Sequence, residues 1–280
     1  MRPPGRWTIK LRGNLSGAWI RTTGRNGEDQ YHTEVESDFR GTLSMAVAYR
    51  GLGAAVALNP MKLAGKSQDY ELNVNSYSNR FGFDIVFLSS KTYHGKASMN
   101  DEVTPIEKGA IRQQALNVNL YYAFNSKRFS FPAAFSQSYL QRRSAGSFMV
   151  GASFDGQITD IDANETANQQ PINLKLMEIG IGAGYGYNLV AGKRWLFHLS
   201  LLPTFDFYIH SRLKENGERI NLHYRFPSLI TTGRGAAVYS WRNQFAVASL
   251  IYNYSVVGDR DQLQVRRSKW RLRFTYGFRF

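Results

Sequence analysis

The final eleven residues of the chain constrain its fold more than any other segment. From Trp270 to Phe280 every even position carries an apolar side chain, whereas arginine, threonine and glycine fill the odd positions. Successive residues of a β-strand point to opposite faces, so this segment predicts a strand with one aromatic face and one basic face. A transmembrane β-barrel needs this pattern, because lipid lies outside its wall and a polar lumen lies inside.

The chain ends on an aromatic residue directly after that strand. Tyr276, Phe278 and Phe280 resemble the C-terminal signal by which bacterial outer-membrane barrels are recognised for insertion. We therefore expect the protein in a bacterial outer membrane, with membrane lipid and, during insertion, the barrel assembly machinery as partners. Residues 1–6 lack the apolar core of a signal peptide, so we expect that the signal was removed from this sequence.

The composition agrees with a barrel. No run approaches 18 apolar residues, which excludes a transmembrane helix, and closed barrels are the other way to satisfy every backbone group in lipid. The mean hydropathy is −0.37 because half of each barrel strand is polar. The chain has no cysteine, which excludes disulfides, thiolate metal sites and a cysteine nucleophile. We expect one domain over residues 1–280, without metal or cofactor.

The same alternation predicts about twelve strands, an even number as single-chain bacterial barrels require. The fold class that follows is an all-β, closed antiparallel transmembrane barrel with both termini in the periplasm. The break near residues 78–80 is the weakest boundary. The expected strands cover residues 7–19, 31–50, 52–58, 69–77, 81–91, 110–124, 144–159, 174–190, 195–210, 223–240, 244–257 and 267–280.

The links between these strands alternate between long and short, as barrels with long external loops and short periplasmic turns do. Residues 92–109, for example, are expected to form an external loop. Residues 125–143 break the rule, because they should be periplasmic and yet are long and aromatic. We expect this segment to cap the barrel mouth or to plug the lumen. The glycine row from Gly180 to Gly186 could lie opposite it, since glycine in a strand marks close approach or bending.

Part of the chain resembles a known family. The stretch Tyr121 to Ser138 with Gln141 to Ser147, the stretch Tyr49 to Gly53 with Asn59-Pro60, and Gly82 to Asp84 look similar to a barrel family of Bacteroides-type bacteria. That family is known only as a domain of unknown function. The resemblance implies an outer-membrane barrel over nearly the whole chain and supplies no catalytic residues.

The formal net charge is +14, and much of the excess falls in the expected periplasmic turns, which hold none of the 21 acidic residues. Such a rim would attract lipid phosphate groups or an acidic periplasmic partner. Its residues are Arg50, Arg80, Lys127, Arg128, Arg142, Arg143, Lys193, Arg194 and Arg242.

A second charged constellation is expected on the lumen faces. Closing the barrel brings the last strand beside the first, so a basic wall would stand next to an acidic ladder. The arrangement could shape the field of a channel or bind a zwitterionic solute, or it could fill the lumen as a salt-bridge network. The residues are Lys10, Arg12, Glu34, Glu36, Asp38, Arg40, Lys269, Arg271 and Arg273.

Three functions follow as hypotheses. The first is a narrow channel for small polar or anionic solutes. The second is a non-conducting scaffold or partner subunit, and the third is a lipid-modifying enzyme. No Ser–His arrangement has convincing spacing for catalysis. Nucleic-acid binding is disfavoured, because the arginines and aromatics alternate between faces instead of gathering in one patch.

Overall fold

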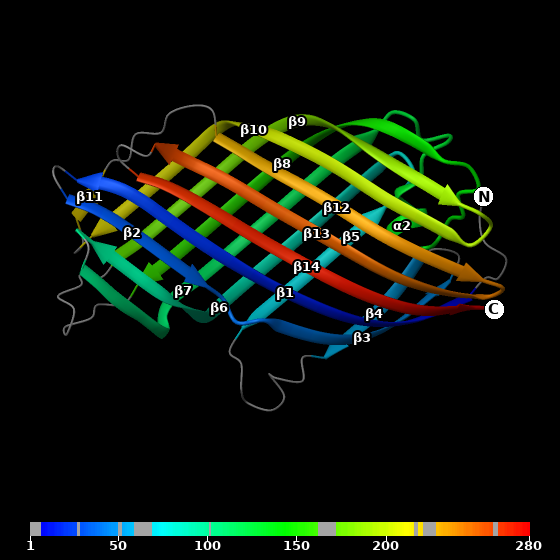
Figure 1. Ribbon diagram of the computed structural model, residues 1–280, viewed down its shortest axis with the longest axis horizontal. Coiled ribbons are helices and arrows are strands. Elements are labelled where there is room, and N and C mark those ends of the chain that lie inside the picture. The colour runs from blue at the N-terminus through cyan, green and yellow to red at the C-terminus, as the bar shows by residue number, and fades with distance from the viewer. Residues whose placement is uncertain are drawn as a thin grey trace.

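The computed structural model describes residues 7–26, 29–49, 52–58, 69–100, 102–161, 172–215, 218–220, 228–259 and 263–280. These residues form a closed antiparallel β-barrel (Figure 1), which confirms the predicted fold class. Ten strands close the ring. They are β1 (Trp7–Asn26), β2 (Asp29–Glu36), β6 (Phe81–Met99), β7 (Glu102–Ala123), β8 (Ala145–Ile161), β9 (Ile172–Ala191), β10 (Trp195–Glu215), β12 (Ser228–Trp241), β13 (Gln244–Asp259) and β14 (Leu263–Arg279).

The ring closes between its first and last strands. β1 pairs with β14 in unbroken register from Thr8 opposite Arg279 to Gly24 opposite Leu263. Backbone hydrogen bonds between Trp7 and Phe280, of 2.9 and 3.0 Å, extend the ladder to the last residue. The end of the barrel that holds Trp7 and Phe280 is called the terminal end below, and the opposite end the loop end.

The strand expected from Tyr31 to Arg50 is divided into β2 and β3 (Arg40–Tyr49). β2 pairs with β1 as far as Glu36 opposite Trp19, and β3 pairs with it from Arg40 opposite Ser16. Three residues, 37–39, therefore face two residues of β1. An extra residue in one of two paired strands is a β-bulge. Beyond the bulge, the positions that would have faced the lumen face outward, and those that would have faced outward face the lumen.

Two further strands lie beside the ring. β4 (Leu52–Leu58) pairs with β3, and β5 (Tyr70–Tyr77) pairs with the terminal half of β6. The loop half of β6 pairs directly with β2, and among the described residues no ladder joins β4 to β5. The predicted break at residues 78–80 is present. The expected strand segments are thus found, but ten of them, not twelve, close the ring.

The strands reach farther at the loop end than the sequence indicates. Most of the expected external loop 92–109 belongs to β6 and β7, which pair from Gly95 opposite Ile106 to Met99 opposite Glu102. A short strand, β11 (Glu218–Ile220), pairs with the end of β10. The outer face of these extensions carries polar residues, so the apolar alternation used for the prediction stops before the strands do.

The outer face of the barrel is apolar over a limited height. On β1 this face runs from Trp7 through Ile9, Leu11 and Leu15 to Trp19, and Arg21 follows on the same face. At about 3.3 Å per residue and a tilt of about 40°, the distance from Trp7 to Trp19 corresponds to a band about 30 Å high, which matches the hydrocarbon core of a bilayer. No helix in the described ranges is long and apolar enough to span a membrane.

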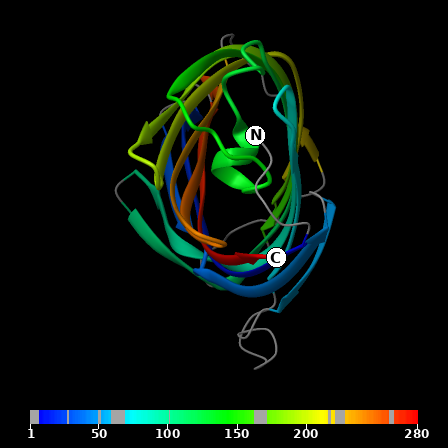
Figure 2. The same ribbon diagram turned by 90° about the vertical axis from the view of Figure 1, so that its right-hand side faces the viewer.

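The barrel interior is filled in three layers. At the terminal end the helix α2 (Phe131–Phe135) lies inside the ring (Figure 2). Buried charged and polar side chains fill the middle. At the loop end an apolar cluster includes Ile20, Val35 and Tyr93. A cavity of about 70 Å³ borders both the middle and the loop-end layers. This volume has room for several water molecules.

Candidate functional site

Seven basic side chains line the lumen face of β1 and β14. They occupy alternate positions of two paired strands, so alternation alone places them on one face. The structure brings together the expected cations Lys10, Arg12, Lys269, Arg271 and Arg273. Arg267 and Arg279 belong to the same face and had not been predicted as part of it. Four of the seven, Lys10, Arg267, Arg271 and Arg279, have a relative exposure below 10%, and the other three are half-buried.

The acidic ladder expected beside this wall differs from the prediction. Val35 is buried with Ile20 inside the barrel, so its neighbours Glu34 and Glu36 point to the outside. Glu34 accepts a hydrogen bond of 2.7 Å from Arg21 there. Asp38 lies within the bulge, and only Arg40, beyond it, faces the lumen as expected. The physical reason is the extra residue in 37–39, which exchanges inside and outside between β2 and β3.

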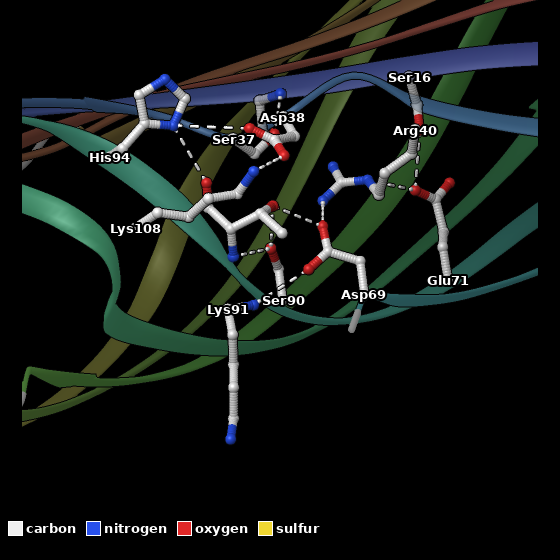
Figure 3. Close-up of polar contacts among 12 residues, drawn as sticks. Ser16, Ser37, Asp38, Arg40, Asp69, Glu71, Ser90, Lys91, His94 and Lys108 are labelled. Atoms are coloured by element: carbon white, nitrogen blue, oxygen red, sulfur yellow. Dashed lines mark hydrogen bonds and ion pairs between the residues drawn. The ribbon is translucent and has the colours of Figure 1, made fainter. Parts of the chain in front are cut away.

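Arg40 is the centre of a buried cluster (Figure 3). Its Nη1 atom lies 3.0 Å from Asp69 Oδ2, and its Nε atom lies 3.4 Å from Glu71 Oε2. Ser16 Oγ donates to the same Glu71 oxygen at 3.0 Å, and Thr92 Oγ1 donates to Asp69 Oδ2 at 2.8 Å. These contacts tie β5 to β1 and β3 through side chains, at a place where the described backbone has no ladder.

A second polar cluster lies on the outer side near the loop end (Figure 3). His94 stands opposite Glu36 in the pairing of β2 with β6, and its Nε2 atom lies 3.8 Å from Glu36 Oε1. Its Nδ1 atom lies 3.7 Å from Asp38 Oδ1, as Figure 3 shows. Lys108 contacts Asp38 as well. An open hollow of about 530 Å³ adjoins these residues. No group of three histidine, aspartate or glutamate side chains in the described ranges has the geometry of a metal site.

Two more arginines sit in the middle layer with carboxylate partners. Arg267 contacts Glu178 and lies 3.3 Å from Asp155 Oδ1. Arg234, only 2% exposed, lies 2.9 Å from Asp84 Oδ2 across the lumen. Neither pair was predicted, because the partners come from strands that are not neighbours in the chain. The charge filling of the lumen is therefore larger than the sequence indicated.

The segment that contains α2 forms the plug, defined as residues 125–143. Phe129 and Phe131 are at most 1% exposed and pack against Tyr121 and Leu202. Ser130 caps the helix by accepting a hydrogen bond of 3.3 Å from the Ala133 amide. Of the glycine row, Gly186 adjoins the plug, because a Cβ atom there would lie 3.0 Å from the ring of Phe129.

A hydrogen-bonded chain of three side chains lies beneath the plug. His198 Nε2 is 2.9 Å from Ser200 Oγ, and His198 Nδ1 is 2.6 Å from Asn188 Oδ1. Asn188 donates through Nδ2 to the Ser130 carbonyl at 3.0 Å and to Gln141 at 2.7 Å. The Asn188 oxygen must therefore accept from His198 Nδ1–H, and Nε2 is left to accept the Ser200 proton.

That tautomer is the one that a nucleophile–base pair uses. His198 and Ser200 share a strand face, so their spacing is visible in the sequence, but it was not predicted as a Ser–His pair. Asn188 could not be found in the same way, because it reaches His198 only through the pairing of β9 with β10. All three side chains are at most 4% exposed, and the aromatic rings of the plug surround His198.

The basic rim is exposed at the terminal end. Arg50 lies outside the described residues. In the part of the chain that the structure describes, none of the other eight makes an ion pair. They are Arg80, Lys127, Arg128, Arg142, Arg143, Lys193, Arg194 and Arg242. Next to them the outward aromatic side chains form a girdle, to which Tyr276, Phe278 and Phe280 contribute with exposures of 49, 41 and 54%.

Comparison with protein families assigns the chain to a family. A family model described as a domain of unknown function, DUF4421, matches residues 1–280, and the chain belongs to this family. A comparison with curated proteins found no match.

Solved structures share the barrel form at low similarity. The outer membrane protease OmpT from Escherichia coli is 7% identical with a TM-score of 0.45, over 100% of this chain and 98% of that one. The outer membrane protein OprG from Pseudomonas aeruginosa is 9% identical with a TM-score of 0.34, over 99% and 98%. The toluene transporter TodX of P. putida is 9% identical with a TM-score of 0.29, over 99% and 91%. None of their activities is transferred to this chain.

Proposed function

We propose that the protein is a closed outer-membrane barrel that conducts no solute and acts through its surfaces, as a scaffold or partner subunit. One observation carries this proposal, namely that three successive layers fill the lumen. The plug occupies the terminal end, ion pairs of Arg234 and Arg267 cross the middle, and an apolar cluster fills the loop end. A filled lumen leaves the outer faces and the rim for function.

The apolar band and the aromatic girdle support a location in a bacterial outer membrane. The terminal end then faces the periplasm, as the short turns there favour. Its eight exposed cations carry no ion-pair partner among the described residues, so they are available to lipid phosphate groups and to an acidic periplasmic partner.

Solute flux into vesicles tests this proposal. The barrel is refolded into lipid vesicles, and swelling is followed in small neutral, cationic and anionic solutes. We expect the same rate as for vesicles without protein. Swelling that depends on folded protein would contradict the proposal. It would favour the channel for small polar or anionic solutes, and the plug would then have to leave the lumen during conduction.

A second candidate function, hydrolysis of an ester or amide, is favoured by the Ser200–His198–Asn188 chain. Ser200 Oγ would attack a carbonyl carbon while its proton passes to His198 Nε2. Arg234 stands opposite Ser200 in the pairing of β10 with β12, and its Nε and Nη1 atoms are buried without a hydrogen-bond partner. These N–H groups could stabilise an oxyanion.

A fluorophosphonate probe tests this second candidate, because it labels only activated serines. We expect labelling that is lost in Ser200→Ala and retained in Ser249→Ala, whose serine also faces the lumen. If the probe labels neither the wild type nor a variant without the plug, the hydrolase function is contradicted. The hydrogen-bonded chain then serves only to anchor the plug.

A further inference from the structure

Between the terminal end and the middle of the lumen, five cations on β1 and β14 have no acidic hydrogen-bond or ion-pair partner among the described residues. Lys10 Nζ donates to the Ser136 carbonyl at 2.6 Å, and Arg279 Nη2 donates to the Gln137 carbonyl at 3.1 Å. Arg273 Nε donates to Asn14 Oδ1 at 2.6 Å, and Arg271 donates to Asn73. Arg12 makes no hydrogen bond or ion pair with any described residue.

The pairing of the two strands holds these cations close together. Asn14 stands opposite Arg273 and Arg12 opposite Thr275, so Arg12 and Arg273 are diagonal neighbours on one face. Diagonal neighbours in a ladder lie within about 7–8 Å of each other, well within reach of two arginine side chains. Lys10 and Arg279 are also diagonal neighbours, along the other diagonal and nearer the terminal end.

The rest of the lumen compensates its charges. Arg40, Arg234 and Arg267 each have a carboxylate partner within 4 Å. None of the five cations has such a partner within 4 Å among the described residues, and repulsion between charges is stronger away from bulk water.

We propose that this cluster binds a phosphate-class oxyanion, with Arg12 and Arg273 as its main ligands. A guanidinium group offers two parallel N–H donors, and this geometry matches the oxygens of a phosphate. Both side chains are half-buried and are not bonded to the plug, whereas Lys10 and Arg279 donate to plug carbonyls. The anion is either a free phosphate compound or the headgroup of an anionic phospholipid. This site goes beyond the proposed scaffold role and does not depend on it.

Binding to the folded, detergent-solubilised barrel tests the proposal. Inorganic phosphate and short-chain phosphatidylglycerol are titrated separately in a phosphate-free, non-ionic detergent at constant ionic strength. We expect saturable binding of at least one. Phosphate binding assigns the site to a soluble ligand, and binding of the phospholipid alone assigns it to a headgroup. If the folded wild-type barrel binds neither, the proposal is wrong.

The double variant R12Q/R273Q should weaken this binding by about tenfold or more, because it removes both forks. The matched control R112Q/K175Q removes two exposed cations near the loop end, outside the rim and the plug, and should bind as the wild type does. Without ligand, R12Q/R273Q should unfold at a higher temperature than the wild type, since it relieves repulsion. Unchanged affinity in this variant would overturn the proposal.

If the two arginines only stabilise the fold, R12Q/R273Q should instead unfold at a lower temperature than the wild type. If R12Q/R273Q does not fold, R12K/R273K keeps both charges and loses the forked geometry. We then expect this variant to fold and to bind several-fold more weakly. Wild-type affinity in the lysine variant would also overturn the assignment of the two arginines as ligands.

Discussion

At the scale of single residues, Arg267 pairs with two carboxylates in the middle layer. It contacts Glu178, which is fully buried, and lies near Asp155. Its Nε atom donates to Ser255 at 3.0 Å. Buried charges of this kind are tolerated only while they are paired, so one arginine here holds two carboxylates inside the barrel.

Replacing Arg267 with methionine should therefore destabilise the barrel strongly. The change leaves Glu178 charged and buried without a partner, and we expect the free energy of unfolding to fall by about 3–5 kcal/mol. Urea unfolding in lipid vesicles measures the loss. Arg266→Met is the matched control, because Arg266 lies on the other face, contacts Gln264 and should change stability little. Equal effects of the two substitutions would contradict this interpretation.

The residues of the lumen wall show which side-chain positions strand alternation predicts and which it does not. Lys10, Arg12 and Arg273 could be placed on the lumen face because β1 and β14 run without interruption. Glu34 and Glu36 could not, because the bulge at residues 37–39 leaves no mark on an alternation that continues in the sequence. The partners of Arg267 depend on which strands meet across the lumen, and no local pattern contains that information.

At the scale of elements, the plug is held by side chains from the barrel wall. Asn188 is fully buried and bonds both Ser130 and Gln141 of the plug. It also orients His198, around which the aromatic rings of the plug gather. These contacts join the two ends of the plug to one place on β9.

The substitution Asn188→Ala should loosen the plug without unfolding the barrel. Loss of these hydrogen bonds should lower the free energy of local opening by about 1–3 kcal/mol, which corresponds to amide exchange that is about 5- to 150-fold faster. Hydrogen–deuterium exchange at residues 129–137 measures this. Asn117→Ala removes a lumen asparagine that bonds Asp155 instead, and it should leave exchange in the plug unchanged. Slow exchange in both variants would contradict the assigned role of Asn188.

The contact of β9 with β10 depends on glycine. A Cβ atom on Gly182 would overlap the carbonyl of Pro203 and lie 2.6 Å from Thr204 Cα, whereas one on Gly233 would meet nothing nearer than 3.9 Å. We expect Gly182→Ala to lower the folded fraction after refolding, because the β10 backbone must move. Gly233→Ala should refold like the wild type, as seen by heat-modifiable migration on a gel. Normal refolding of Gly182→Ala would show that the close approach is not required.

The positions of most strands could be predicted, because the alternation of side chains is a property of each strand alone. How the strands join is a property of pairs. β2 meets β6 directly and leaves β4 and β5 beside the ring, next to the bulge and the Arg40 cluster, and no strand pattern contains this pairing. The helix within 125–143 was also not visible, since its five residues are too few for a helical period.

At the scale of the whole molecule, the apolar band positions the barrel in the membrane. Leu201 lies on the outer face, 55% exposed, six residues from Trp195 in the terminal girdle. At about 3.3 Å per residue and a tilt of about 40°, this places it about 15 Å into the band, near the centre of the bilayer.

Leu201→Arg should therefore reduce the free energy of folding into lipid by about 2–4 kcal/mol, as charges at the midplane of a barrel do. Val103→Arg is the control, because Val103 is 61% exposed on the extension of β7 at the loop end, beyond the band. Refolding equilibria in lipid vesicles compare the two. An equal loss in both variants would mean that the band is not where the lipid lies.

The filled lumen is the property of the whole molecule on which the proposed function rests. Plug, ion pairs and apolar cluster come from different strands, and they block the lumen at successive heights only because the barrel closes around them. Single-channel recording in a planar bilayer tests this most directly, with barrel shown to be folded by its heat-modifiable migration. We predict no conductance steps across the voltage range that the bilayer tolerates. Steady conductance from the folded wild-type barrel would contradict the closed lumen and would make the protein a channel.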